Sequence, residues 1–120
     1  MKRGDDGIRL RIFIDESLRY DHKPLYEHLV ERARRDGLAG ATVLRGMEGY
    51  GAHRRLHTTR LIDVSVDLPV IVELIDSADA IRRFLASLDG VIAHGTATLS
   101  PVHIIKYSPG SAESPFPPGS

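Results

Sequence analysis

The sequence predicts an α+β fold of the ferredoxin-like type, a βαββαβ sandwich whose four-stranded antiparallel sheet carries two helices on one face. Three observations lead to this prediction. The hydrophobic patterns follow the order strand, helix, strand, strand, helix, strand along the chain. Two stretches are amphipathic at helical spacing, and the first strand alternates with a period of two. A chain of 120 residues fits one domain.

The first half of the chain supplies a strand, a helix and a second strand. Residues 8–14 (IRLRIFI) alternate between their two faces, which predicts a strand with one buried face. Pro24 suits the first turn of a helix, because its missing N–H costs nothing there. Apolar residues then recur at helical spacing until Gly37, which tolerates positive φ and ends the helix. Residues 41–47 (ATVLRGM) are strand-like.

The second half repeats this order and adds a tail. Residues 61–76 supply strand material interrupted by Pro69, and its firmest part is 70–75, because a central strand does not easily hold a proline. Ser77 caps the second helix, which Gly90 closes, and the last strand is expected at 101–107. The domain therefore spans 1–107. Residues 108–120, rich in Pro, Ser and Gly, predict a disordered tail.

Nothing in the chain is predicted to cover the second face of the sheet. Apolar residues that can be assigned near strand centres indicate that this face is apolar as well: Phe13, Val43, Ile71 and Ile105. An exposed apolar face calls for a partner, so we expect a homo-oligomer that assembles through the sheets. The alternative is an open sheet that is partly in contact with water.

Composition and charge narrow the functional classes. The 16 basic and 16 acidic residues cancel, so binding to nucleic acid is not expected from the molecule as a whole. The absence of cysteine excludes disulfides and thiolate metal sites. The N-terminus lacks the apolar core of a signal peptide, and no stretch is long enough for a membrane span. These features predict a soluble, cytoplasmic protein.

The densest group of cations lies in a glycine-rich segment, residues 45–61 (RGMEGYGAHRRLHTTRL). Glycines let a backbone approach a ligand, and successive N–H groups in such a turn can form an anion-binding nest. A strand end followed by a tight turn is the plainer interpretation of the same glycines, and a solvated loop surface is the plainer interpretation of the arginines.

Taken in order, KPLYEHLVERA, GATVLRGMEGYG, HRRLH, DLPVIVELID and HIIKY resemble the PII-like family of signalling proteins across roughly residues 8–107. The resemblance implies a homotrimer with the sheets lining its centre. It implies that small anions such as ATP, ADP or AMP bind in clefts between subunits. It also implies that the segment 45–61 is a mobile loop that contacts a target protein, for which a membrane transporter is one candidate.

The sequence departs from PII proteins at their phosphate loop. The pattern TGxxGDGK before the last strand is replaced by DGVIAHGTATLSP, which has no lysine. Here a histidine, a glycine amide and a hydroxyl remain as donors, and in the loop Arg side chains and glycine amides would contact phosphates. The expected ligand-binding residues are Arg45, Gly46, Gly49, Gly51, His53, Arg54, Arg55, His94, Gly95 and Thr96.

Catalysis and metal binding are the alternatives on the same fold. His53 and His57 are four residues apart, a spacing that suits a metal on a helix, but the segment is not helical in pattern and lacks a third ligand nearby. Acid pairs such as Asp15 and Glu16 are common at strand ends, and no serine lies in a nucleophile motif. We therefore expect no catalytic residue, metal or cofactor, and a regulatory rather than enzymatic protein; a metal-handling protein or a small enzyme is the alternative.

Overall fold

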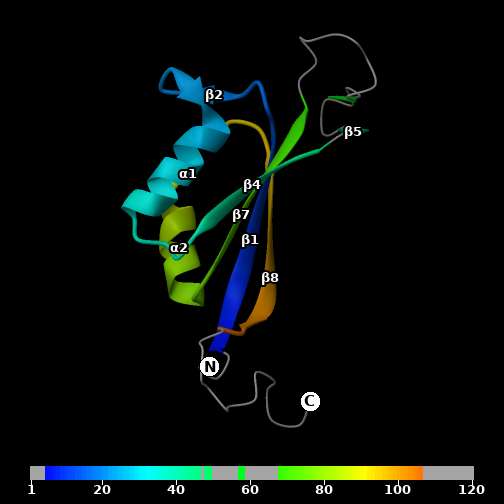
Figure 1. The fold of residues 1–120 in the computed structure, drawn as a ribbon. Helices are drawn as coiled ribbons and strands as arrows, with labels where there is room; N and C mark the ends of the chain where they lie inside the picture. The colour runs from blue at the N-terminus through cyan, green and yellow to red at the C-terminus, as the bar shows by residue number, and fades with distance from the viewer. Residues whose placement is uncertain (1–4, 47, 50–56, 59–67, 107–120) are drawn as a thin grey trace.

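The computed structural model describes residues 5–46, 48–49, 57–58 and 68–106. A four-stranded antiparallel sheet has the order β4-β7-β1-β8, and both helices of the described chain pack on one of its faces (Figure 1). This is the predicted ferredoxin-like sandwich. The sheet strands and helices are β1 (Asp5–Asp15), α1 (Leu25–Arg35), β4 (Ala41–Arg45), β7 (Pro69–Asp76), α2 (Ala78–Ser87) and β8 (Thr96–Ile104).

Two short ladders complete the described secondary structure. One joins β2 (Arg19–Tyr20) to β3 (Lys23–Pro24), and the other joins β5 (Glu48–Gly49) to β6 (His57–Thr58). The first ladder lies within a segment expected to be a polar connection. Its two turn residues, Asp21 and His22, have positive φ, as a two-residue hairpin of this hand requires. Neither helix in the described part of the chain is long and apolar enough to cross a membrane.

The core lies between the helices and one face of the sheet. Because side chains alternate along a strand, every second residue of β1 and β7 points toward the helices. There they meet the apolar stripes of α1 and α2, as the periodicity predicted. The buried members are Leu10, Ile12, Ile14, Leu25, Leu29, Ala33, Val70, Val72, Leu74, Ile81, Phe84, Leu88 and Val91.

Both helices end as the sequence predicted. After α1, Gly37 has a φ of +80°, and the N–H of Leu38 donates to the carbonyl of Ala33 at 3.0 Å, which forms a Schellman motif. At the start of α2, the Ser77 hydroxyl accepts from the Ala80 N–H at 3.2 Å. Gly90 follows α2 with a φ of +77°. The folding signals at these ends are therefore local.

Two strand boundaries differ from the prediction. The last strand spans Thr96–Ile104, not 101–107, so it begins five residues earlier. Its polar start and Pro101 hid it, because β8 is an edge strand that tolerates both. Pro69 belongs to the central strand β7, but as its first residue, where a missing N–H is least harmful.

The second face of the sheet carries no helix from the described residues. Phe13, Leu44 and Ile71 lie on it side by side, since the register pairs Phe13 with Ile71 and Ile71 with Leu44. Val43 was expected here, but it pairs with the buried Val72 and so shares the helix face. Ile105 lies beyond the end of β8. We call this uncovered surface the open face. The predicted tail, residues 108–120, lies outside the described residues.

Candidate functional site

The described candidate ligand-binding residues gather at one end of the sheet. This is the end where β1 and β4 finish and where β7 and β8 begin, and it is uppermost in Figure 1. Arg45 and Gly46 lie at the end of β4, while His94, Gly95 and Thr96 lead into β8. Although 49 positions separate Arg45 from His94 in the sequence, the antiparallel topology brings both to this upper end.

The two groups lie on opposite edges of the sheet. Thr96 pairs with Phe13, Phe13 with Ile71, and Ile71 with Leu44, so two strands separate β8 from β4. At about 4.8 Å between neighbouring strands, the edges are about 14 Å apart. One subunit therefore does not bring Arg45 and Thr96 to the same phosphate group.

Glu16 connects the end of β1 to the end of β4. Its carboxylate accepts from Arg45 Nη2 at 2.8 Å and from the backbone N–H of Leu68 at 3.2 Å. The Glu16 side chain is about one quarter exposed, whereas that of Arg45 is more than half exposed. A carboxylate bound in this way fixes the point where the segment 47–67 leaves and rejoins the sheet. The charge of Arg45 is therefore already balanced, and an anion at this place would compete with Glu16.

Gly46 completes this base. Its N–H donates to the carbonyl of Pro69 at 2.7 Å. A Cβ built on Gly46 would lie 2.7 Å from Pro69 Cγ and 3.3 Å from Pro69 O, so the site accepts only glycine without a shift. The glycine that the sequence suggested as a ligand contact thus has a packing reason to be there.

Part of the segment between the two strands forms a ladder, although it was expected to be irregular. Glu48 pairs with Thr58 and Gly49 with His57, which extends the β4–β7 connection away from the sheet. Gly49 therefore lies in a short strand. Four of the candidate ligand-binding residues lie outside the described residues and stay predictions: Gly51, His53, Arg54 and Arg55.

At the opposite edge, Gly95 lies against β1. A Cβ there would be 2.9 Å from Ile14 Cγ2 and 3.0 Å from the carbonyl oxygen of Phe13, so glycine is needed for the chain to enter β8. His94 and Thr96 are both exposed beside it. The chemistry available at this edge is a hydroxyl, an imidazole and backbone N–H groups, all of which can contact an anion without a lysine.

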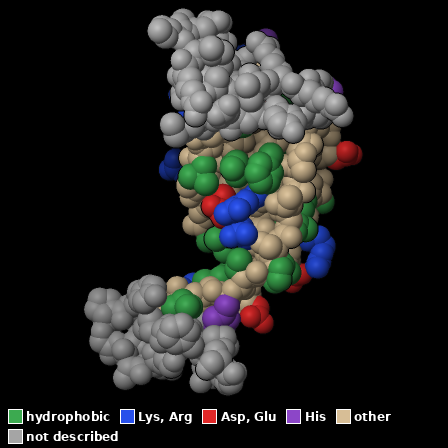
Figure 2. All heavy atoms as spheres, turned by 90° about the vertical axis from the view of Figure 1, so that its right-hand side faces the viewer, with side chains coloured by type: hydrophobic (Ala, Val, Ile, Leu, Met, Phe, Trp, Pro, Cys, Tyr) green, Lys and Arg blue, Asp and Glu red, His purple; other side chains and the backbone are tan. Residues whose placement is uncertain are grey.

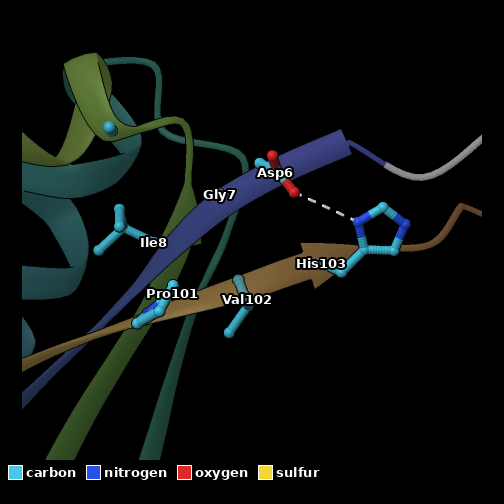
Figure 3. Close-up of a pocket in the computed structure, with 7 residues that line it drawn as sticks. Asp6, Gly7, Ile8, Pro101, Val102 and His103 are labelled. Carbon is cyan, nitrogen blue, oxygen red and sulfur yellow. Dashed lines mark hydrogen bonds and ion pairs between the residues drawn. The ribbon is translucent and has the colours of Figure 1, made fainter. Parts of the chain in front are cut away.

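A shallow groove of about 500 Å³ lies at the lower end of the sheet, near the start of α2 (Figure 3). Asp6 and His103 approach each other across β1 and β8, with 3.4 Å between Oδ1 and Nδ1. The same groove is lined by Gly7, Ile8 and Pro101. Sequence reasoning did not single out Asp6, because its partner lies 97 positions away.

The histidines do not assemble a metal site in the described part of the chain. His94 and His103 are nine positions apart on an extended segment, which separates them by about 30 Å. The described residues include no group of three side chains suited to hold a metal ion. His53 lies outside the described residues, and only the backbone of His57 is described there.

Comparisons with known proteins agree with this fold. The family model DUF190, described as "Uncharacterized ACR, COG1993", matches residues 7–104. A UPF0166 protein of Aquifex aeolicus (strain VF5) is 42% identical over 96 residues, which cover 80% of this chain and 90% of the relative. The UPF0166 protein MJ1524 of Methanocaldococcus jannaschii is 34% identical over 98 residues, covering 81% and 90%.

Solved structures with the same fold are PII-like proteins. CPII, a nitrogen regulatory PII-like protein from Thiomonas intermedia K12 solved with ADP, AMP and bicarbonate, superposes with a TM-score of 0.64 at 15% identity, covering 85% of this chain and 91% of that chain. A protein from Thermus thermophilus, described as a PII-like signaling protein, gives 0.63 at 23% identity, covering 86% and 93%. With a family model matched along almost the whole sheet and helices, the chain belongs to the DUF190 (UPF0166) family, whose fold is PII-like.

Proposed function

We propose that this protein is a PII-like regulator that binds a small anionic ligand, such as an adenine nucleotide, between the subunits of a homotrimer. The observation that carries the proposal is the split of the candidate residues between opposite edges of one sheet. Arg45 and Gly46 lie on β4, and Gly95 and Thr96 on β8, all at the upper end. The PII-like fold of the family adds to it.

A ring of subunits would complete the split site. When copies are related by an axis roughly parallel to the strands, every upper end stays on the same side. The β4 edge of one subunit then faces the β8 edge of the next, and Arg45 and Gly46 lie beside Gly95 and Thr96 of a neighbour. In that arrangement the open faces line the axis, which would also remove Phe13, Leu44 and Ile71 from water.

Arginine guanidinium groups, glycine N–H groups and the Thr96 hydroxyl suit phosphate oxygens, with Arg54 and Arg55 adding charge from the loop. Since CPII was solved with ADP, AMP and bicarbonate, bicarbonate is a second small anion to consider for this chain. The absence of a phosphate-loop lysine favours a ligand with fewer phosphates than ATP.

Binding would be reported to a target protein in the cytoplasm through the loop of residues 45–61, without turnover of the ligand. The base of that loop connects the two regions, because Glu16 holds Arg45 and Leu68 at the same end as Thr96. A ligand that draws Arg45 away from Glu16 would release one of the contacts that fix the loop's origin.

Calorimetric titration of the purified protein with ATP, ADP, AMP, cyclic nucleotides and bicarbonate tests the proposal, with parallel measurement of mass and of nucleotide hydrolysis. Saturable binding of one of these ligands to a trimer without turnover is the expected result. Thr96→Val should weaken that binding, whereas Thr42→Val, an exposed threonine at the middle of β4, should not. A stable monomer, or steady turnover of the ligand, would contradict it.

A further inference from the structure

Two arginines share one carboxylate at the middle of the open face. Glu73 of β7 lies opposite Arg11 of β1 in the register. Its Oε1 is 3.4 Å from Arg11 Nε and 3.7 Å from Arg9 Nε. Figure 2 shows this group as blue side chains next to a red one, with hydrophobic side chains above and below. The group therefore carries one more positive than negative charge, on a face that is otherwise apolar.

The surroundings within the subunit do not balance this charge. Arg9 Nε is buried and has no hydrogen-bond partner among the described residues. The β8 residues opposite these arginines are Ser100, which pairs with Arg9, and Thr98, which pairs with Arg11. Their hydroxyl groups are neutral and suited to an oxyanion as well as to water. Asp15 is on the same face, but it is four positions beyond Arg11, about 13 Å along the strand.

Assembly through the open face would bury the excess charge. Removing an unpaired guanidinium from water is strongly unfavourable unless a counter-charge accompanies it. Identical subunits related by rotation bring identical groups, so each added subunit brings a further positive charge to the same region. The apolar neighbours favour burial while the arginines oppose it, and a bound anion resolves this conflict.

We propose that Arg9 and Arg11 bind a small inorganic oxyanion, of the size of phosphate or sulfate, when neighbouring subunits cover the open face. This inference rests on the assembly described under the proposed function and is separate from the ligand site at the upper end of the sheet. Guanidinium groups bind planar or tetrahedral oxyanions through pairs of N–H groups, and Ser100 and Thr98 lie beside them to donate a hydroxyl. The anion then acts as a structural component of the oligomer.

An anion that binds only the assembled form must strengthen assembly. At an anion concentration ten times its Kd, linkage raises the association constant about tenfold for each site filled. Sedimentation equilibrium of the full chain, with inorganic phosphate compared with chloride at equal ionic strength, measures this directly. Because phosphate also strengthens apolar contacts in general, the wild-type protein alone is not sufficient.

Matched variants separate the two effects. Arg9→Gln and Arg11→Gln should each remove the specific response to phosphate, while Arg34→Gln, an exposed change on α1, should keep it. Glu73→Gln leaves both arginines unpaired and should increase the response. Circular dichroism checks that each variant is folded.

Two results would overturn the inference and leave the proposed function in place. One is a wild-type trimer whose association constant is the same in phosphate and chloride. The other is a loss of assembly in Asp15→Asn equal to that in Arg9→Gln, which would mean that a neighbour's carboxylate serves as the counter-charge. A monomer under all conditions would instead contradict the assembly on which both proposals depend.

Discussion

Glu16 and Arg45 form an ion pair that spans β7: the carboxylate at the end of β1 accepts from the guanidinium at the end of β4, with 2.8 Å between Oε2 and Nη2. The same carboxylate holds the N–H of Leu68. One side chain therefore connects three strand ends at the base of the long loop. This geometry joins the candidate ligand residues on β4 to the point where the chain returns to the sheet.

Replacing Glu16 by Gln should loosen this base without unfolding the protein. The pair is partly exposed, so its loss should reduce the free energy of unfolding by no more than about 1 kcal/mol. The amide of Leu68 should exchange its hydrogen faster, because its acceptor is weakened. Asp79→Asn, which breaks the exposed Asp79–Arg82 pair on α2, is the control and should leave exchange at Leu68 unchanged. Equal exchange rates in Glu16→Gln and the wild type would show that the pair does not hold the loop base.

Gly46→Ala should destabilise the fold by about 1–3 kcal/mol, because the added Cβ collides with the Pro69 ring and carbonyl. Gly40→Ala is a close control, since nothing lies within 4 Å of a Cβ at that position. Urea unfolding of both variants measures the difference. Equal midpoints would mean that β7 shifts easily to accept the methyl group.

The double change Arg54→Ala and Arg55→Ala should weaken ligand or target binding by about 1–3 kcal/mol, because charged hydrogen bonds are lost. Its thermal midpoint should stay close to that of the wild type, since loop cations add little stability. Calorimetry with the ligand identified in the nucleotide and bicarbonate screen measures the first quantity. Unchanged binding together with a clearly lower midpoint would assign these arginines a structural role.

His28 predicts a dependence of stability on pH. Partial burial, and then the charge of Arg32, lower the pKa of His28 below its ordinary value of 6.5. The unfolded chain therefore takes up this proton at a higher pH than the folded one. The free energy of unfolding should accordingly fall as the pH drops below about 6.5.

His28→Gln should flatten that slope in urea titrations between pH 5 and pH 7. His22→Asn, which removes an exposed imidazole from the β2–β3 turn, controls for the loss of any histidine. A slope in His28→Gln as steep as in the wild type would show that other groups set the pH dependence.

Removal of residues 108–120 should leave the mass of the assembly and its thermal midpoint nearly unchanged. The composition of this segment offers little apolar surface to pack. Light scattering and thermal unfolding of the truncated chain test this. A fall to monomers or a large drop in midpoint would assign the segment to the interface.

Local signals carried most of the fold prediction, and the exceptions have physical causes. Ser77, Gly37 and Gly90 act within a few residues, so one sequence suffices to predict the helix ends. The β2–β3 hairpin was missed because its turn, Asp21–His22, lacks the usual Asn-Gly or Asp-Gly signal. The start of β8 was missed because an edge strand needs no apolar alternation.

The candidate site was less predictable. Glycine and arginine content located the end of β4, but the Glu16–Arg45 pair joins residues 29 positions apart, and no spacing rule predicts such a contact. Similarly, the cluster of Arg9, Arg11 and Glu73 depends on strand register, which hydrophobic periodicity alone does not determine. Gly46 and Gly95 were chosen as ligand contacts, and the structure adds that neither position has room for a Cβ.

The pairing of Asp5 with Ile104 has a practical consequence. The first and last sheet residues are cross-strand neighbours at the lower end, while Arg45, Gly46, Gly95 and Thr96 are at the upper end (Figure 1). A β-strand rises about 3.3 Å per residue, so the 11 residues of β1 separate the two ends by roughly 33 Å. A fluorescent fusion, an affinity tag or a sensor-surface linkage attached at either terminus would therefore join the sheet on the side away from the ligand residues. Both termini are suitable attachment points for the binding experiments described above.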